Sequence, residues 1–265
     1  LARATSNIPL VQTELGDFDG ARRGFLAAYG AFRAIDHQLG QGNALANLAM
    51  LEIRLGNPAA ALPLLADAQR HYSGEYADAE ANALGQRATA WSALGDLQRA
   101  ITDADSGLAI ARAAGLEQES AAALEVLADL HLKAGSPRLA LRRLAEADSI
   151  DALLGLAVER GNNLRRSSEV LLELGEAPAA AAQAERALRA HQEVEARAEI
   201  VQDHLQLALS LWHSGDQVRA GEEAEIGLQE AAAVGNPAAI HDAAAVAALL
   251  TDDTVFENTG PVPDG

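Results

Sequence analysis

Glycine recurs along this chain at a nearly constant interval, and this period constrains the fold more than any other feature. The series is Gly16, Gly56, Gly95, Gly135, Gly175 and Gly215, with spacings of 40, 39, 40, 40 and 40. Alanine follows each glycine five residues later, at Ala21, Ala61, Ala100, Ala140, Ala180 and Ala220. Such a period is typical of tandem structural repeats, in which each unit packs only on its neighbours.

Two further columns hold small residues. Seven residues before the repeat glycine stand Ala49, Ala88, Ala128, Ser168 and Ala208, and Pro9 breaks this column in the first repeat. Twelve residues after it stand Ala28, Ala68, Gly107, Ala147, Ala187 and Gly227. Small residues at matched points of two helices indicate close contact, because added methylenes would force the helices apart.

The residues around each repeat glycine punctuate helices. A residue that can cap a helix follows directly in five repeats, at Asp17, Asn57, Asp96, Ser136 and Asp216, and its side-chain oxygen can accept from free backbone N–H groups. A second stop comes midway to the next repeat glycine, at Gly115, Gly155 and Gly235. We place this stop at Gly40 and Gly74 in the first two repeats, and Glu195 occupies the position in the fifth.

These signals predict an all-α fold, a right-handed α-solenoid of tandem antiparallel helix pairs. The expected first helices are 2–15, 42–55, 76–94, 117–134, 157–174 and 195–214. The expected second helices are 18–38, 58–73, 97–114, 137–154, 177–193 and 217–234. Pro63 lies inside the second of these and is expected to bend it. A final helix at 237–250 has no partner and is expected to cap the stack.

The period predicts a single repeat domain over residues 1–250. Its six repeats are expected at about 2–40, 41–75, 76–115, 116–155, 156–194 and 195–235, followed by the cap at 237–250. Residues 251–265 lose the period and are interpreted as an acidic tail or linker, in which Phe256 could still pin the chain locally. Composition agrees with helix throughout, because Ala and Leu dominate the apolar residues and only nine residues are aromatic.

The columns together resemble the tetratricopeptide repeat (TPR) over residues 2–234, and the segment GNALANLAMLEIRLGN at 42–57 is especially similar. The period is longer than that of the usual motif, the closing proline is missing, and the early aromatic is replaced by Leu45, Leu84, Leu124, Leu164 and His204. The resemblance is to the longer subtype found in bacterial signalling ATPases, transcription regulators and kinesin light chains. HEAT and armadillo repeats share the period but fit the Gly–Ala columns less well.

Charge and composition narrow the possible partners. The formal net charge is −18, from 20 basic and 38 acidic residues, which disfavours nucleic acid and anionic membranes. It serves solubility or attracts a basic partner. The absence of cysteine excludes thiolate chemistry without deciding the compartment, and we expect a cytoplasmic location. The chain begins with Leu1, and we expect it to be part of a longer protein.

No motif for catalysis, metal binding or cofactor binding is found. The seven histidines form no HExxH or His-x3-His pattern, and no glycine-rich phosphate loop or GxSxG elbow occurs. His131 is expected to pack, and pairs such as Asp103 and Asp105 are interpreted as solvated faces. We therefore expect no catalytic residues, no cofactor and no metal.

A column of polar residues on the first helices is the better candidate site. In TPR superhelices these helices line the concave surface, and the resembling subtype uses Asn there to hold an extended peptide. Nine residues before the repeat glycine lie Asn7, Asn47, Gln86, Val126, Arg166 and Gln206. A neighbouring column holds Asn43, Asn82, Asn162 and Gln202, and Arg165 adds a cation for a carboxylate or phosphate. Amides both donate and accept, so they can pair with peptide backbone; the alternative is a polar helix face.

The sequence thus favours a non-catalytic module that binds a protein or peptide in this groove, as the regulatory or sensor part of a larger bacterial signalling or transcription-regulating protein. Two alternatives stay open. One is a structural scaffold that self-associates through its terminal repeats. The other is a region of an enzyme with a site assembled from distant repeats.

Overall fold

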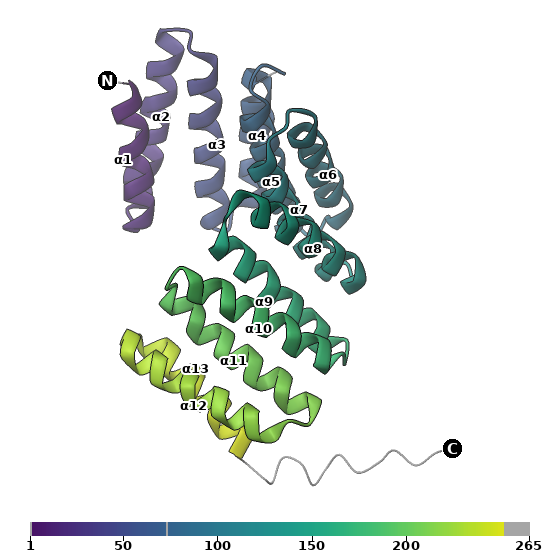
Figure 1. Cartoon of the computed structure of the whole chain (residues 1–265). Helices are drawn as coiled ribbons and strands as arrows, with labels where there is room; N and C mark the ends of the chain where they lie inside the picture. The colour runs from purple at the N-terminus through teal and green to yellow at the C-terminus, as the bar shows by residue number, and fades with distance from the viewer. Residues whose placement is uncertain (1, 73, 252–265) are drawn as a thin grey trace. The chain divides into compact units, whose positions relative to one another are not determined.

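The computed structural model describes residues 2–72 and 74–251, with side chains for 8–72 and 74–250. These residues form thirteen α-helices and no strand (Figure 1). Their bounds are α1 (Ala2–Glu14), α2 (Phe18–Ala34), α3 (Gln38–Arg54), α4 (Pro58–Tyr72), α5 (Ala77–Ala93), α6 (Leu97–Ala113), α7 (Glu117–Lys133), α8 (Pro137–Leu154), α9 (Ala157–Glu173), α10 (Ala177–Glu193), α11 (Arg197–Ser214), α12 (Gln217–Val234) and α13 (Pro237–Thr251). The predicted helix pairs are confirmed.

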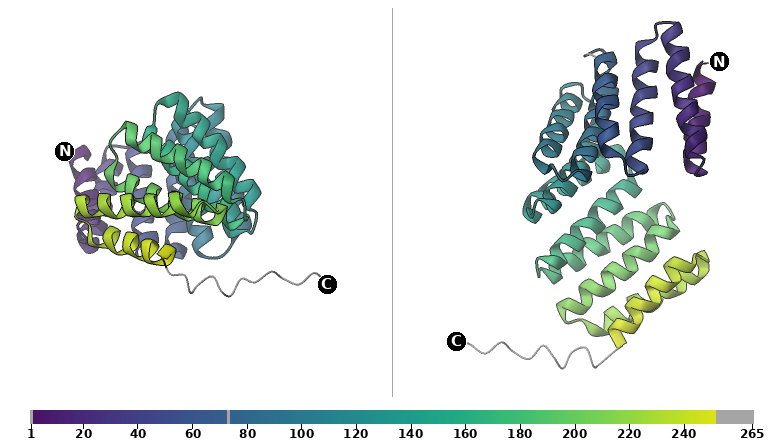
Figure 2. Two further views of the ribbon diagram at one scale, coloured as in Figure 1. Left: turned by 60° about the horizontal axis from the view of Figure 1, so that its bottom comes forward. Right: turned by 180° about the vertical axis from the view of Figure 1, so that it is seen from behind.

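The chain divides into two compact units, residues 1–143 and 144–265, and the division falls inside α8. Within each unit, helices follow in chain order and run antiparallel to their neighbours (Figures 1 and 2). Each odd-numbered helix also contacts the next odd-numbered one: α1 with α3, α3 with α5 and α5 with α7 in unit 1, then α9 with α11 and α11 with α13 in unit 2. The odd helices therefore form one layer of each unit.

Twelve turns join the helices, and each contains one residue in the left-handed region. Ten are glycines and two are Asp36 (φ 50°) and Glu195 (φ 55°). The prediction of a stop at Gly40 is wrong, because α2 ends at Ala34, Asp36 makes the turn, and α3 already begins at Gln38. Gly40 lies inside α3, where an added Cβ would come within 2.4 Å of the Phe32 ring. The smallest structural unit is therefore one helix with one turn, at half the period of the glycine series.

The alanine column lies where the helices touch. All six residues, Ala21, Ala61, Ala100, Ala140, Ala180 and Ala220, have an exposed fraction of 0%. The capping prediction is confirmed at Asp17, Asp96 and Asp216, whose carboxylates accept from backbone N–H groups in the first turn of α2, α6 and α12. Asn57 instead donates its amide to Glu52 over 3.2 Å. The column of small residues therefore sets how closely neighbouring helices approach.

A second buried column fills the seam between each even helix and the odd helix that follows. In unit 1 it is apolar: Phe32 packs with Ala44, and Tyr72 with Ala83. In unit 2 the seam between α8 and α9 is polar, because Asn163 donates to Asp151 over 2.9 Å. The seam between α12 and α13 is apolar, because Ala231 packs with Ala243. The column is most polar in the seam between α10 and α11, where His191 faces Asp203.

Helix α13 packs on α11 and α12, as expected of a cap, and buries Ala243 and Leu250. Pro63 lies within α4, which continues through it from Pro58 to Tyr72. The predicted tail at 251–265, including Phe256, lies outside the residues whose side chains are described. Across the described residues, every helix is too short or too polar to cross a bilayer.

Candidate functional site

Four of the predicted amide side chains gather around one hollow in unit 1. Asn43 and Asn47 on α3 and Asn82 and Gln86 on α5 line a depression of about 560 Å³, which extends to α7. Its remaining wall comes mainly from small residues of α5 and α7 and from Met50. The four amides therefore lie together on the layer of odd helices.

Asn43 is held in place by a tyrosine that sequence reasoning did not select. The Tyr72 hydroxyl donates to Asn43 Oδ1 over 3.0 Å. Burial, and then the negative charge of Asp78, raise the pKa of Tyr72 above its usual range, so the phenol keeps its proton and donates. With Oδ1 engaged in this way, the Asn43 amide nitrogen is left to donate towards the hollow.

Gln86 presents the opposite group. Its Oε1 is buried, and no described residue donates a hydrogen bond to it. A buried acceptor without a donor is costly to leave unpaired. The hollow thus combines a donor on α3 with an unsatisfied acceptor on α5, which are the two groups that an extended peptide backbone can satisfy.

A second hollow of about 440 Å³ lies beside the first, between α1, α2 and α3. The two share Leu39, Asn43 and Asn47 on α3, so they adjoin along this helix, and together they are called the groove along α3. The second hollow is lined by Leu10, Phe25 and Phe32. Sequence reasoning missed these aromatic residues, although a signal was present: seven of the nine aromatic residues precede residue 92.

The predicted site residues of unit 2 are mostly engaged within the protein. Arg165 donates to Asn162 Oδ1 over 2.9 Å and lies 3.4 Å from Asp203 Oδ1. Gln206 is buried and donates to Ser168 Oγ over 3.1 Å. Arg165 therefore pairs with a carboxylate of its own chain instead of being free to bind an anion.

The remaining predicted residues are placed as follows. Gln202 is exposed and lines a smaller hollow of about 230 Å³ in unit 2, together with Arg165 and Asn236. Arg166 is half-buried. Asn7 lies on α1, outside the residues whose side chains are described. The structure therefore concentrates the usable amides in unit 1.

Unit 2 instead holds a buried charge cluster. His191 Nε2 lies 3.1 Å from the Val158 carbonyl oxygen, while Nδ1 faces Asp203. Between α11 and α12, His204 Nδ1 lies 2.7 Å from Glu223 Oε2. These contacts are structural ion pairs and hydrogen bonds, and the described residues contain no group of three or more His, Cys, Asp or Glu side chains placed to hold a metal ion.

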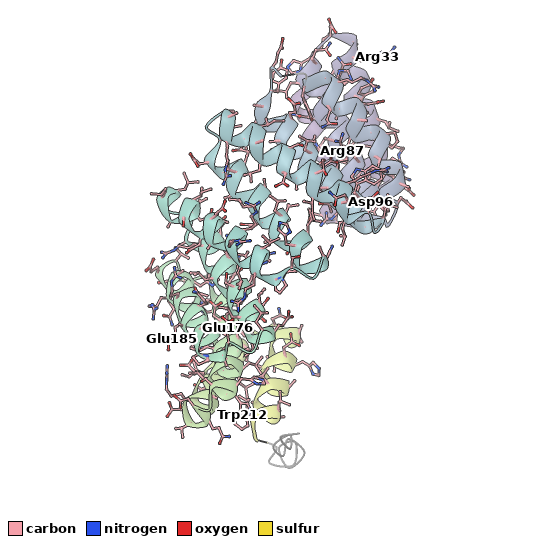
Figure 3. All side chains as sticks on the ribbon, turned by 90° about the vertical axis from the view of Figure 1, so that its right-hand side faces the viewer. Arg33, Arg87, Asp96, Glu176, Glu185 and Trp212 are labelled. Carbon is pink, nitrogen blue, oxygen red and sulfur yellow. The ribbon has the colours of Figure 1, made fainter. Side chains whose placement is uncertain are left out.

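A separate polar cluster joins α4, α5 and α6 in unit 1. Arg87 on α5 pairs with Asp103 on α6 through Nε and Nη2, at 2.6 Å each, and also donates to Gln69 (Figure 3). Arg99 lies 4.7 Å from the centroid of the Trp91 ring. Each of these cations is occupied by a neighbour, so this face offers fewer unpaired groups than the groove along α3.

No protein-family profile and no curated protein matches the sequence. Solved structures do match the fold. BtubC (BKLC) from P. vanneervenii aligns with a TM-score of 0.71 and 16% identity, over 85% of this chain and 92% of that one. A signal-transduction ATPase with a tetratricopeptide-repeat sensor from Pyrococcus horikoshii aligns with a TM-score of 0.78 and 16% identity, over 96% of this chain and 40% of that one.

A third match is a Rap protein complexed with Competence and Sporulation Factor, with a TM-score of 0.65, 12% identity, and coverage of 93% of this chain and 73% of that one. At these identities the likeness concerns the fold. It agrees with the glycine and alanine columns, the antiparallel helix pairs and the layer of odd helices. The chain has a TPR-like fold, an α-solenoid of tandem helix pairs.

Proposed function

We propose that this chain is a non-catalytic binding module that takes an extended peptide segment of a partner protein in the groove along α3. One observation carries the proposal: Asn43, Asn47, Asn82 and Gln86 surround a single hollow, in which Gln86 Oε1 is a buried acceptor without a donor. An extended segment has backbone N–H and C=O groups that the helices leave unpaired, and side-chain amides can satisfy both.

We further propose a regulatory role, in which binding is relayed to another part of a signalling or transcription-regulating protein. The support is the likeness to a signal-transduction ATPase with a tetratricopeptide-repeat sensor, of which this chain covers 40%, and to a Rap protein that was solved with a bound factor. Binding to one layer of a solenoid can be communicated because neighbouring repeats share packed seams.

The test locates the partner and then measures its affinity. A photo-crosslinking residue at Thr89, which lines the groove, is compared with one at Thr102, which is exposed on α6. We expect the Thr89 position to capture a defined segment, whose synthetic peptide binds the wild-type chain. The Asn47→Ala/Gln86→Ala variant should weaken that peptide about 30- to 140-fold, for two lost hydrogen bonds of about 1–1.5 kcal/mol each.

The variant should fold normally, because both residues lie on a partly exposed helix face and alanine favours helix. Equal capture from Thr102, or an unchanged affinity in the double variant, would refute the groove as the binding site. A circular-dichroism spectrum and a melting curve of the variant provide the folding control.

A second candidate function, end-to-end self-association, is favoured by one observation. Helix α1 exposes Ile8 and Val11 at 60% and 58% of their surface, and Leu15 directly after it at 80%. An uncovered apolar helix face of a repeat protein can stack on another chain. If it does, light scattering will show concentration-dependent oligomers that Val11→Glu abolishes; a monomer at every concentration excludes this function for the chain.

A further inference from the structure

The groove along α3 has two ends of different chemistry. The hollow between α1, α2 and α3 is walled by Phe25, Phe32, Leu10 and Leu39 and contains no Asp, Glu, Lys or Arg among its described lining residues. His37 stands at its edge, where Nδ1 accepts from the Gly40 N–H over 2.9 Å. An apolar hollow of this kind accepts a large apolar side chain and excludes a charged one.

The other end is acidic. Asp78 on α5 and Glu119 on α7 are the charged residues among those described that line the larger hollow, and neither hollow is lined by a described Lys or Arg. In the described part of the chain, neither carboxylate forms an ion pair or a side-chain hydrogen bond. Asp78 and Tyr72 line the same hollow, and the charge of Asp78 helps to raise the pKa of the Tyr72 phenol. This end attracts a cation, as does the net charge of −18.

The larger hollow also holds the groups that can engage peptide backbone. Asn43, fixed by Tyr72, donates, and the buried Gln86 Oε1 accepts. The unsatisfied Gln86 oxygen marks the same hollow independently of the acidic residues, because no described residue donates a hydrogen bond to it. The groove therefore has an apolar subsite between α1, α2 and α3, while the amides and the two carboxylates share the larger hollow that extends to α7.

We propose, resting on the function proposed above, that the segment bound in the groove carries a large apolar side chain and, a few residues away, a Lys or Arg. The apolar side chain occupies the hollow at Phe25 and Phe32, and the cation lies between Asp78 and Glu119. Packed helices are about 8–10 Å apart, and the two subsites are one to two helix spacings from each other. An extended chain advances about 3.3 Å per residue, so the separation is about three to six residues.

The experiment uses fluorescein-labelled twelve-residue peptides with a Ser/Gly/Thr background. Each peptide carries one Phe and one Arg at separations of two to eight residues, and comparison peptides carry Phe alone, Arg alone or Phe with Glu. Fluorescence anisotropy should show the tightest binding at separations of about three to six, at least 10-fold tighter than the peptide with Phe alone. Raising the salt concentration should weaken binding of the Arg peptides only.

Variants of the chain test which residues bind the cation and which bind the apolar side chain. Asp78→Asn/Glu119→Gln should remove the advantage of Arg and its salt dependence while leaving the peptide with Phe alone unchanged. The matched control, Glu75→Gln/Glu117→Gln, removes the same charge from exposed positions that do not line the groove, and it should bind like wild type. Leu10→Asp, at a half-exposed position of the apolar hollow, should weaken every Phe peptide about 10-fold.

The outcomes separate this inference from the function on which it rests. If no Phe–Arg peptide binds at millimolar concentration, or if the control variant matches Asp78→Asn/Glu119→Gln, the two-ended specificity is wrong. In that case the segment captured at Thr89 can still depend on Asn47 and Gln86, which keeps the proposed function. If the affinity of the captured segment is unchanged by Asn47→Ala/Gln86→Ala, the proposed function itself is refuted.

Discussion

His191 Nδ1 lies 2.5 Å from Asp203 Oδ2, and both side chains have an exposed fraction of 0%. The other ring nitrogen faces the Val158 carbonyl, so both nitrogens have acceptors and the imidazole is suited to carry two protons. Burial acts to lower the pKa of His191, but the hydrogen bond and charge of Asp203, with the Val158 carbonyl, outweigh it and raise the pKa. Arg165 supplies a second cation to the same carboxylate.

The raised pKa predicts that this pair stabilises unit 2 most at low pH. Its contribution is fully present below the ordinary histidine pKa of 6.5 and is lost as the pH rises through the pKa of folded His191. His191→Gln should therefore lower the free energy of unfolding by about 3 kcal/mol at pH 6 and by less at pH 9. Urea denaturation at both pH values measures the gap, with the exposed His213→Gln as control. A gap that widens at pH 9 would contradict the assignment.

His131 in unit 1 should respond in the opposite direction. Burial, and then the positive charge of Arg143, lower the pKa of His131, while Asp105 opposes them. The unfolded chain then binds a proton more readily, so stability falls as the pH drops below about 6.5, by at most about 1.4 kcal/mol per pH unit. His131→Leu should flatten this dependence between pH 6.5 and 5 in denaturant titrations; an unchanged slope shows that other groups cause it.

The left-handed turn at Glu195 predicts a stabilising substitution. A residue with a Cβ in this conformation costs about 1–2 kcal/mol relative to glycine, and Glu195 is exposed at φ 55°. Glu195→Gly should therefore raise the free energy of unfolding by about 1 kcal/mol. The reverse change at a matched turn, Gly175→Ala, should lower it by a similar amount. Midpoints of chemical denaturation decide; a destabilised Glu195→Gly would mean that its side chain contributes more than the turn costs.

Gly42 should be intolerant of even a methyl group. A Cβ at this position would come 2.4 Å from Tyr72 Cε1, so the ring that holds Asn43 would have to move. Gly42→Ala should cost about 1–3 kcal/mol through overpacking and weaken groove ligands. Gly30→Ala, in the neighbouring helix with no atom within 4 Å of its Cβ, should gain about 0.5–1 kcal/mol from helix propensity. Equal changes in the free energy of unfolding of the two variants would show that Tyr72 does not pack against Gly42.

The fold was predictable because its signals are local and repeated. Glycines in the turns, capping aspartates and the alanine column each recur at a fixed position, and Ala100 and Ala140 lie fully buried as that column requires. The first turn was misplaced because Gly40 looked like a helix stop. In the structure Gly40 serves close packing against Phe32, and Asp36, a residue type that tolerates the left-handed region, makes the turn.

The candidate site was predictable only in part, because periodicity shows which residues share a face but not which ones are engaged. Asn47 and Gln206 occupy the same column, yet Asn47 lines the groove and Gln206 bonds to Ser168. In the repeat before that of Gln206, Ser168 stands in the column of small residues where most repeats have alanine. Its hydroxyl oxygen accepts the hydrogen bond from Gln206. Tyr72 and Asp78 escaped notice for a related reason, because they belong to no repeated polar column. Glu119 does recur with Glu159 and Glu199 at the repeat spacing, but it joins Tyr72 and Asp78 around one hollow only when α4, α5 and α7 pack.

The pairing of each helix with one left-handed turn has a consequence for how the chain tolerates insertions. Adding one helix with its turn would reverse the direction of every helix that follows within the layer, so residues that had faced the groove would be moved to the opposite side. Adding two helices would preserve both sides and only lengthen the stack. We therefore expect lineages of such chains to grow and shrink by whole helix pairs, even though each pair is built from two turns of one kind.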